Sequence, residues 1–430
     1  MCINIIFIFY LSYLKNINSV IQFTFTKKLK LINETQFYEY LYNNEYITNI
    51  SIGTPPQKIP ITLNFDKHSF FIFDKEQSGE YNKKLSTTYN LINDKKVLLY
   101  LEYISEGFES NETIILNDDL GKEIKIEKAS FILSTEKDKK YEKIPSAGIG
   151  LNFKTFSSIK HENFLNHLVE RKIINSFAYF LNFNENNYEE GKIFIGSYPH
   201  EFDVQNYDEN NFNFISVSFS GNKNSIYEVP FDTYEFNKQK YFLNKIYFNA
   251  SFGGILGNNN LKIELDKFFF SDLYSKNICF QVKNKDKIFI YCNENFNVKN
   301  FSGIKFHSKQ FNYTFELNYN DLFKKEGNKF YFLMCFDPFL QQNFEVGEIF
   351  FRKYPFLFDQ DRKIVGFYKV KKKEFNFFGL FIVIIIILIV ICIFLLVYLI
   401  KYIYIKPRKI RANELSDNYD YIPQKDFQIN

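Results

Sequence analysis

Residues 46–57 have the sequence Tyr-Ile-Thr-Asn-Ile-Ser-Ile-Gly-Thr-Pro-Pro-Gln, in which apolar and polar residues alternate up to a Gly-Thr-Pro-Pro turn. Alternation with a period of two places every second side chain on the same face of a strand. After the turn, Ile59, Ile61 and Leu63 resume this period. The segment therefore predicts a β-hairpin.

The composition limits the classes of protein to consider. A chain of 430 residues with 46% hydrophobic content can bury one large two-lobed domain or two to three smaller ones. The net charge is only +4, and lysines and glutamates are interleaved along the chain, so we expect no nucleic-acid partner. The five histidines are scattered, which predicts neither a metal site nor a bound cofactor.

Residues 375–400 contain no charged side chain. At about 1.5 Å per residue, such a helix is long enough to cross a hydrocarbon core of about 30 Å. Residues 1–19 contain a shorter apolar run followed by polar residues, which is typical of a signal peptide, although an uncleaved anchor is the alternative. We expect a single-pass type I membrane protein of the secretory or endosomal pathway or the cell surface, with a cytoplasmic tail over 401–430.

Six Asn-x-Ser/Thr sequons precede this span and none follows it, which agrees with that orientation. The candidate glycosylation sites are Asn33, Asn49, Asn111, Asn249, Asn300 and Asn312.

The hairpin and the motifs that follow it closely resemble, in their order along the chain, those of the pepsin-like aspartic peptidases (eukaryotic aspartyl proteases). The further motifs lie at 96–116, 147–151, 164–168, 173–181, 191–196, 254–256, 265–274, 346–354, 358–359 and 364–367. The resemblance implies a mainly β, bilobal fold with a central cleft. Its lobes would cover 46–200 and 201–370, after a short prosegment-like region at 20–45.

The catalytic residues of this family look absent. The chemistry needs two carboxylates that share one proton, one from each lobe. Gapless alignment places the first aspartate on Asn64 and the second on Gly257, and no carboxylate is present in 257–261. An alternative register uses Asp66 for the first site but needs an insertion and a compensating deletion.

The resemblance also implies other features. Tyr103 would lie in the flap hairpin that covers the cleft. Cys292 and Cys335 bracket the region of a family disulfide, and Cys279 could compete for either partner.

These features predict a pseudopeptidase that binds peptide or protein in its cleft without hydrolysis and contacts the lipid bilayer through one helix. One alternative is an active aspartic endopeptidase that uses Asp66 and an unidentified partner. Another is a surface glycoprotein that keeps the fold only as a scaffold.

Overall fold

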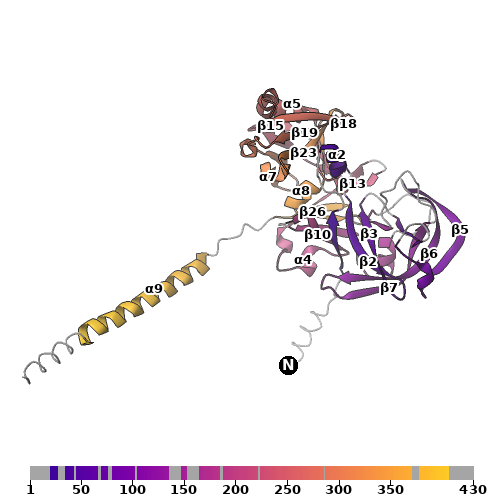
Figure 1. Ribbon diagram of the computed structural model, residues 1–430, viewed down its shortest axis with the longest axis horizontal. Helices are drawn as coiled ribbons and strands as arrows, with labels where there is room; N and C mark the ends of the chain where they lie inside the picture. The colour runs from indigo at the N-terminus through magenta and orange to yellow at the C-terminus, as the bar shows by residue number, and fades with distance from the viewer. Residues whose placement is uncertain are drawn as a thin grey trace, which may run out of the picture. The chain divides into compact units, whose positions relative to one another are not determined.

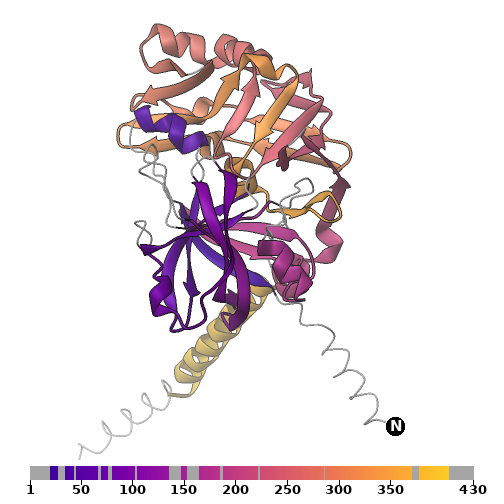
Figure 2. The same ribbon diagram turned by 90° about the vertical axis from the view of Figure 1, so that its right-hand side faces the viewer.

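The computed structural model describes residues 20–27, 34–42, 45–65, 69–75, 80–101, 104–134, 147–152, 164–184, 187–220, 223–284, 286–369 and 377–405. Residues up to 370 form one compact unit and residues 371–430 another. The first unit is mainly β, as predicted, and carries the hairpins and crossing strands seen in Figures 1 and 2.

The largest sheet has thirteen strands and includes strands from both lobes. Across the sheet they are β11 (Phe212–Ser216), β26 (Ile364–Tyr368), β25 (Phe356–Asp359), β9 (Ala178–Asn184), β10 (Asn187–Ile195), β1 (Ile21–Lys27), β2 (Tyr46–Ile52), β3 (Gln57–Asn64), β8 (Ala147–Gly150), β4 (Phe70–Phe73), β7 (Glu123–Ser134), β6 (Ile104–Asp118) and β5 (Asn90–Leu101). The predicted hairpin is confirmed: β2 and β3 pair antiparallel from Tyr46 opposite Leu63 to Ile52 opposite Gln57.

Two further sheets build the second lobe. The first contains β12 (Ser218–Ser220), β13 (Lys223–Pro230), β16 (Lys245–Asn249), β24 (Asn343–Val346), β17 (Ile255–Asn258), β23 (Lys329–Asp337), β19 (Lys287–Asn293) and β18 (Cys279–Asn284), with β22 (Phe323–Glu326) paired to β23. The second contains β15 (Gln239–Phe242), β14 (Thr233–Phe236), β20 (Ile304–Ser308) and β21 (Tyr313–Leu317).

Most helices of the first unit are short. They are α2 (Glu34–Tyr42), α3 (Phe164–Glu170), α4 (Pro199–Phe202), α5 (Asn259–Leu265), α6 (Ser271–Ser275), α7 (Tyr319–Leu322) and α8 (Glu348–Lys353). In the second unit, α9 (Phe377–Ile400) is followed by a π-helical turn over Lys401–Ile405. Among the described residues, 384–403 form one helical stretch long and apolar enough to cross a membrane.

The core is packed largely by aromatic rings because the sequence is rich in phenylalanine and tyrosine. Phe315, for example, lies within 5.0 Å, ring centre to ring centre, of both Tyr354 and Phe367. Both contacts are edge-on or tilted, the geometry that aromatic pairs prefer over a face-to-face sandwich. These contacts tie β21 to α8 and β26, whose sequences lie far apart.

The predicted disulfide between Cys292 and Cys335 is wrong. Cys279 and Cys292 face each other across the β18–β19 hairpin and form the disulfide instead. Cys292 lies opposite Phe330 on β23, and Cys335 is five residues further along that strand, or roughly 16 Å away at the rise of an extended chain. Cys335 is a buried free thiol at 3.5 Å from the hydroxyl of Tyr42.

Gly347, which joins β24 to α8, has no room for a larger side chain. A Cβ atom there would lie 1.8 Å from the carbonyl oxygen of Phe252. We predict that Gly347→Ala lowers the free energy of unfolding by about 3 kcal/mol or more, because backbone must move to relieve the clash.

Denaturant unfolding of the full chain measures this effect. The control is Gly121→Ala, where φ is +81° but nothing lies within 4 Å, so the cost should be only about 1 kcal/mol. Equal costs at the two positions would contradict the packing described for Gly347.

Candidate functional site

The first lobe contains a motif of crossing strands at its centre. β3 runs parallel to β8, and β8 pairs antiparallel with β4, so that Leu63 and Phe70 lie opposite Ile149 from its two sides. β4 in turn runs parallel to β7. Residues 64–69 connect β3 to β4, beginning with Asn64 at the last position of β3.

The second lobe repeats this motif with the same register. β16 runs parallel to β24, β24 pairs antiparallel with β17, and Phe248 and Ile255 lie opposite Val346. β17 runs parallel to β23. Residues 249–254 connect β16 to β17, a loop of the same length as 64–69.

Backbone hydrogen bonds support this equivalence. The amide of Gly150 donates to the carbonyl of Ser69 at 3.0 Å, and the amide of Gly347 donates to the carbonyl of Gly254 at 3.0 Å. The second-lobe counterpart of Asn64 is therefore Asn249, the last residue of β16. Counting along the loops, the counterpart of Asp66 is Ser251.

This register does not support the sequence-based choice of Gly257. Gly257 lies in β17 beyond the loop, opposite Phe336 of β23. A Cβ atom there would meet the ring of Phe336 at 3.2 Å and the sulfur of Met334 at 3.3 Å, both in the buried core. Alignment by sequence missed the shift because the glycines and asparagines of 253–260 give several similar registers.

Two predicted residues lie outside the described part of the chain. Asp66 belongs to the first loop in the sequence but lies outside the described residues, so its alternative register stays a prediction. Tyr103, in the segment predicted as the flap, is also outside the described residues. Asn64 is half-buried, and its carbonyl accepts a hydrogen bond from the amide of Leu151 at 2.7 Å.

The second-lobe loop has the sequence Asn-Ala-Ser-Phe-Gly-Gly and contains no acid. A carboxylate nevertheless lies beside it, because Glu345 of β24 accepts a hydrogen bond from the side-chain amide of Asn249 at 2.7 Å. Sequence reasoning did not single out Glu345, since only the parallel pairing of β16 with β24 brings it to the loop.

Helix α2 covers this same loop. The amide of Gly253 donates to the carbonyl of Leu41 at 2.7 Å, and a Cβ atom on Gly254 would lie 2.7 Å from the side chain of Leu41. The rings of Tyr42 and Phe252 lie 5.0 Å apart. The two glycines thus let α2 approach the loop closely, and Figure 2 shows the indigo helix against strands of the second lobe.

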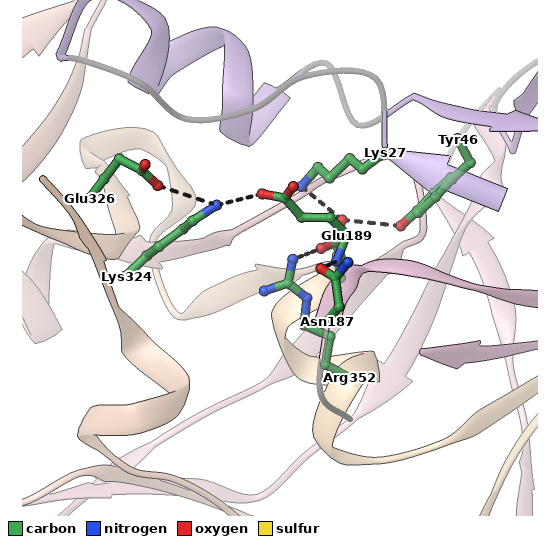
Figure 3. Close-up of polar contacts among 8 residues, drawn as sticks. Lys27, Tyr46, Asn187, Glu189, Lys324, Glu326 and Arg352 are labelled. Atoms are coloured by element: carbon green, nitrogen blue, oxygen red, sulfur yellow. Dashed lines mark hydrogen bonds and ion pairs between the residues drawn. The ribbon is translucent and has the colours of Figure 1, made fainter. Parts of the chain in front are cut away.

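A buried ionic cluster lies near the N-terminal segment (Figure 3). Glu348 of α8 is fully buried, accepts a hydrogen bond from Tyr46 at 3.3 Å and forms an ion pair with Lys27 at 2.9 Å. Arg352, one turn further along α8, binds the other oxygen of the same carboxylate. Because a buried carboxylate is unstable without partners, these donors hold β1, β2 and α8 together.

Two groups near this cluster have lowered pKa values. Burial is the main reason that the pKa of Lys27 is lowered to about 8, with the charges of Arg352 and Lys324 contributing. Burial alone would raise the pKa of the Tyr40 phenol, but the charges of Lys27, Arg352 and Lys324 together lower it to about 7. Three cations therefore act on one phenol.

The predicted glycosylation sites stay predictions. Asn49, Asn300 and Asn312 are exposed, and Asn111 is partly exposed. Asn249 is bonded to Glu345, and Asn33 lies outside the described residues. Among the described residues, no group of three or more His, Cys, Asp or Glu side chains is arranged to hold a metal ion.

Two lobes with a shared central motif define a pepsin-like fold, and comparison with known proteins agrees. Residues 45–370 match the family model for eukaryotic aspartyl proteases, which covers most of the chain. The chain belongs to the eukaryotic aspartyl protease family.

Among solved structures, basic 7S globulin from soybean superposes with a TM-score of 0.56 at 12% identity, covering 82% of this chain and 95% of that chain. At this identity the likeness concerns the fold. Comparison with curated proteins finds no match.

The buried cluster gives a stability prediction. Replacing Lys27 by methionine keeps most of the unbranched side chain but removes a positive charge from buried Glu348. We expect the free energy of unfolding to fall by about 3–5 kcal/mol, because a buried carboxylate loses a partner. Thermal or denaturant unfolding of the full chain measures it.

Lys58→Met is the matched control, since Lys58 is exposed on β3. This variant should change stability by less than about 0.5 kcal/mol. A Lys27→Met variant as stable as the control would show that the Lys27–Glu348 contact contributes little.

Proposed function

We propose that this protein is a membrane-anchored, non-catalytic member of its family that binds peptide or protein in its cleft without hydrolysing it. The observation that carries the proposal is the acid-free sequence of the second-lobe loop, 249–254. Aspartic peptidases need two carboxylates that share a proton, since one activates water while the other donates to the carbonyl. Neither a serine nor an asparagine supplies such a group at neutral or acid pH.

The packing of α2 also supports the proposal. The carbonyl of Leu41 in α2 accepts a hydrogen bond from the amide of Gly253. Gly253 belongs to loop 249–254, which would carry the catalytic group of the second lobe. We infer that a helix packed against this loop limits the access of a substrate to it. Peptide binding along the rest of the cleft requires only backbone hydrogen bonds and side-chain pockets, which do not depend on a catalytic pair.

The second candidate is an active aspartic endopeptidase. It is favoured by one observation, the position of Glu345 beside Asn249, because this glutamate would be the second-lobe carboxylate in a pair with Asp66.

Anchoring to a membrane is the other part of the proposal. The apolar helical stretch at 384–403 supports it by length and composition. The signal peptide at 1–19 and the sequons ahead of the span favour the type I orientation, with the two lobes on the lumenal or extracellular side.

Proteolysis and binding assays on the purified full chain test the proposed function. We expect no cleavage of an unfolded, fluorescently labelled protein between about pH 3 and pH 7, where a carboxylate pair would titrate. We expect the same labelled protein to bind, as measured by fluorescence anisotropy. A pepstatin-type inhibitor should not change the background cleavage.

Asp66→Asn and Glu345→Gln separate the two candidates, with Asp272→Asn as a control at an exposed acid. If wild-type cleavage is sensitive to the inhibitor and is lost in either of the first two variants but not in the control, the endopeptidase is correct and the proposal is wrong. Absence of both cleavage and binding would instead favour a scaffold.

A further inference from the structure

A cavity of about 380 Å³ lies beside the buried cluster. Its walls come from α2, β10, the α7–β22 segment, β23 and α8. The lining residues are Tyr40, Asn187, Tyr188, Glu189, Asn320, Asp321, Phe323, Lys324, Lys325, Leu333, Ile349, Arg352 and Lys353. This volume is in the range of cavities that bind small molecules.

Positive charge exceeds negative charge around this cavity. Lys324 is paired with both Glu189 and Glu326 (Figure 3), at 3.0 and 4.0 Å, and Lys353 is paired with Asp321 at 2.7 Å. Lys325 has no carboxylate within ion-pair distance among the described residues. The lining residues themselves thus include four positive and two negative side chains.

The buried cluster beside the cavity also has an excess of positive charge. Arg352 and Lys27 share the single carboxylate of Glu348. One positive charge there is therefore not balanced.

Three buried polar atoms in or beside this cluster lack hydrogen-bond partners in the described part of the chain. They are Nζ of Lys27, which is ion-paired with Glu348, the hydroxyl of Tyr40 and the Nε atom of Arg352. Two ammonium groups lie near the Tyr40 ring, with Lys27 3.9 Å and Lys324 4.7 Å from its centre. A buried donor without an acceptor is costly, so an acceptor supplied by a ligand would be stabilising.

We propose that this cavity binds a small organic carboxylate, or the terminal carboxylate of a peptide. Arg352 and Lys324 supply positive charge, and the Tyr40 hydroxyl supplies a hydrogen bond. The apolar walls at Phe323, Leu333 and Ile349 suit a ligand that carries hydrocarbon, which inorganic anions lack. This site does not depend on the proposed cleft function.

The state of Tyr40 agrees with the inferred site. Its pKa is lowered to about 7 because the neighbouring cations favour a negative charge at this point. A bound carboxylate would supply that charge and would hold Tyr40 in its neutral, donating form.

Calorimetric titration of the full chain in non-ionic detergent tests the site with succinate as the probe. We expect saturable binding that Tyr40→Phe weakens roughly tenfold or more, the usual effect of losing a hydrogen bond to a charged group. Tyr234→Phe is the matched control, because the Tyr234 hydroxyl is also buried without a partner but does not line the cavity. The control should bind as the wild type does.

Further titrations identify the source of the carboxylate. A tripeptide with a free C-terminus is compared with its amidated form, and binding of only the free acid supports the site with a peptide as its source. Phosphate and chloride, added at equal ionic strength, test whether the cavity attracts any anion rather than a carboxylate. The inference is overturned if these ions compete as well as succinate does, if Tyr40→Phe binds normally, or if no carboxylate binds.

A spectroscopic measurement on the wild type covers the case in which Tyr40→Phe does not fold. Absorbance of tyrosinate is followed as pH is raised from 6 to 9, with and without succinate. We expect the tyrosine that ionises near pH 7 to ionise at higher pH when succinate is bound. An unchanged titration curve would overturn the inference.

Discussion

The burial of Glu348 is the constraint on which the interior of this fold depends. Its carboxylate is fully buried and is bonded by Tyr46 of β2, Lys27 of β1 and Arg352 of α8. Removing a carboxylate from water costs several kcal/mol, so the fold is stable only when these donors are in place. Because α8 directly follows β24, the same contacts fix one strand of the crossing motif in the second lobe relative to the first lobe.

The crossing motifs explain why the fold does not require acids in its connecting loops. Buried apolar residues such as Ile149 and Val346 lie at the points where strands cross, and they determine the packing of each lobe. Among the described loop residues, Phe65, Ala250 and Phe252 are buried in that core, whereas the polar residues Asn64, Asn249 and Ser251 are only partly buried. These partly buried positions can therefore change from acids to Asn or Ser while the strands keep their register.

The sequence predicted the parts of the fold that depend on local patterns. The alternation over 46–63 and its Gly-Thr-Pro-Pro turn were enough to predict the β2–β3 hairpin, and the ordered motifs were enough to predict the bilobal fold. Features that depend on the register between paired strands were not predicted. The partner of Cys292 follows from the β18–β19 register, and the counterpart of Asn64 follows from the parallel pairing of β16 with β24.

The cavity proposed to bind a carboxylate could not be predicted from the sequence, for a related reason. Tyr40 and Arg352 are more than 300 residues apart, and neither belongs to a recognisable motif. Their unsatisfied donors are evident only once α2 and α8 are packed together. Composition indicated many tyrosines and lysines but gave no means of selecting these.

The position of β1 between β10 and β2 has a consequence for maturation. Proteolytic trimming that removed residues 20–45 would open a gap inside a continuous sheet, uncover the Gly253–Gly254 backbone and leave Glu348 without its lysine. Strand β1 and helix α2 thus act as parts of the folded body rather than as a separate appendage.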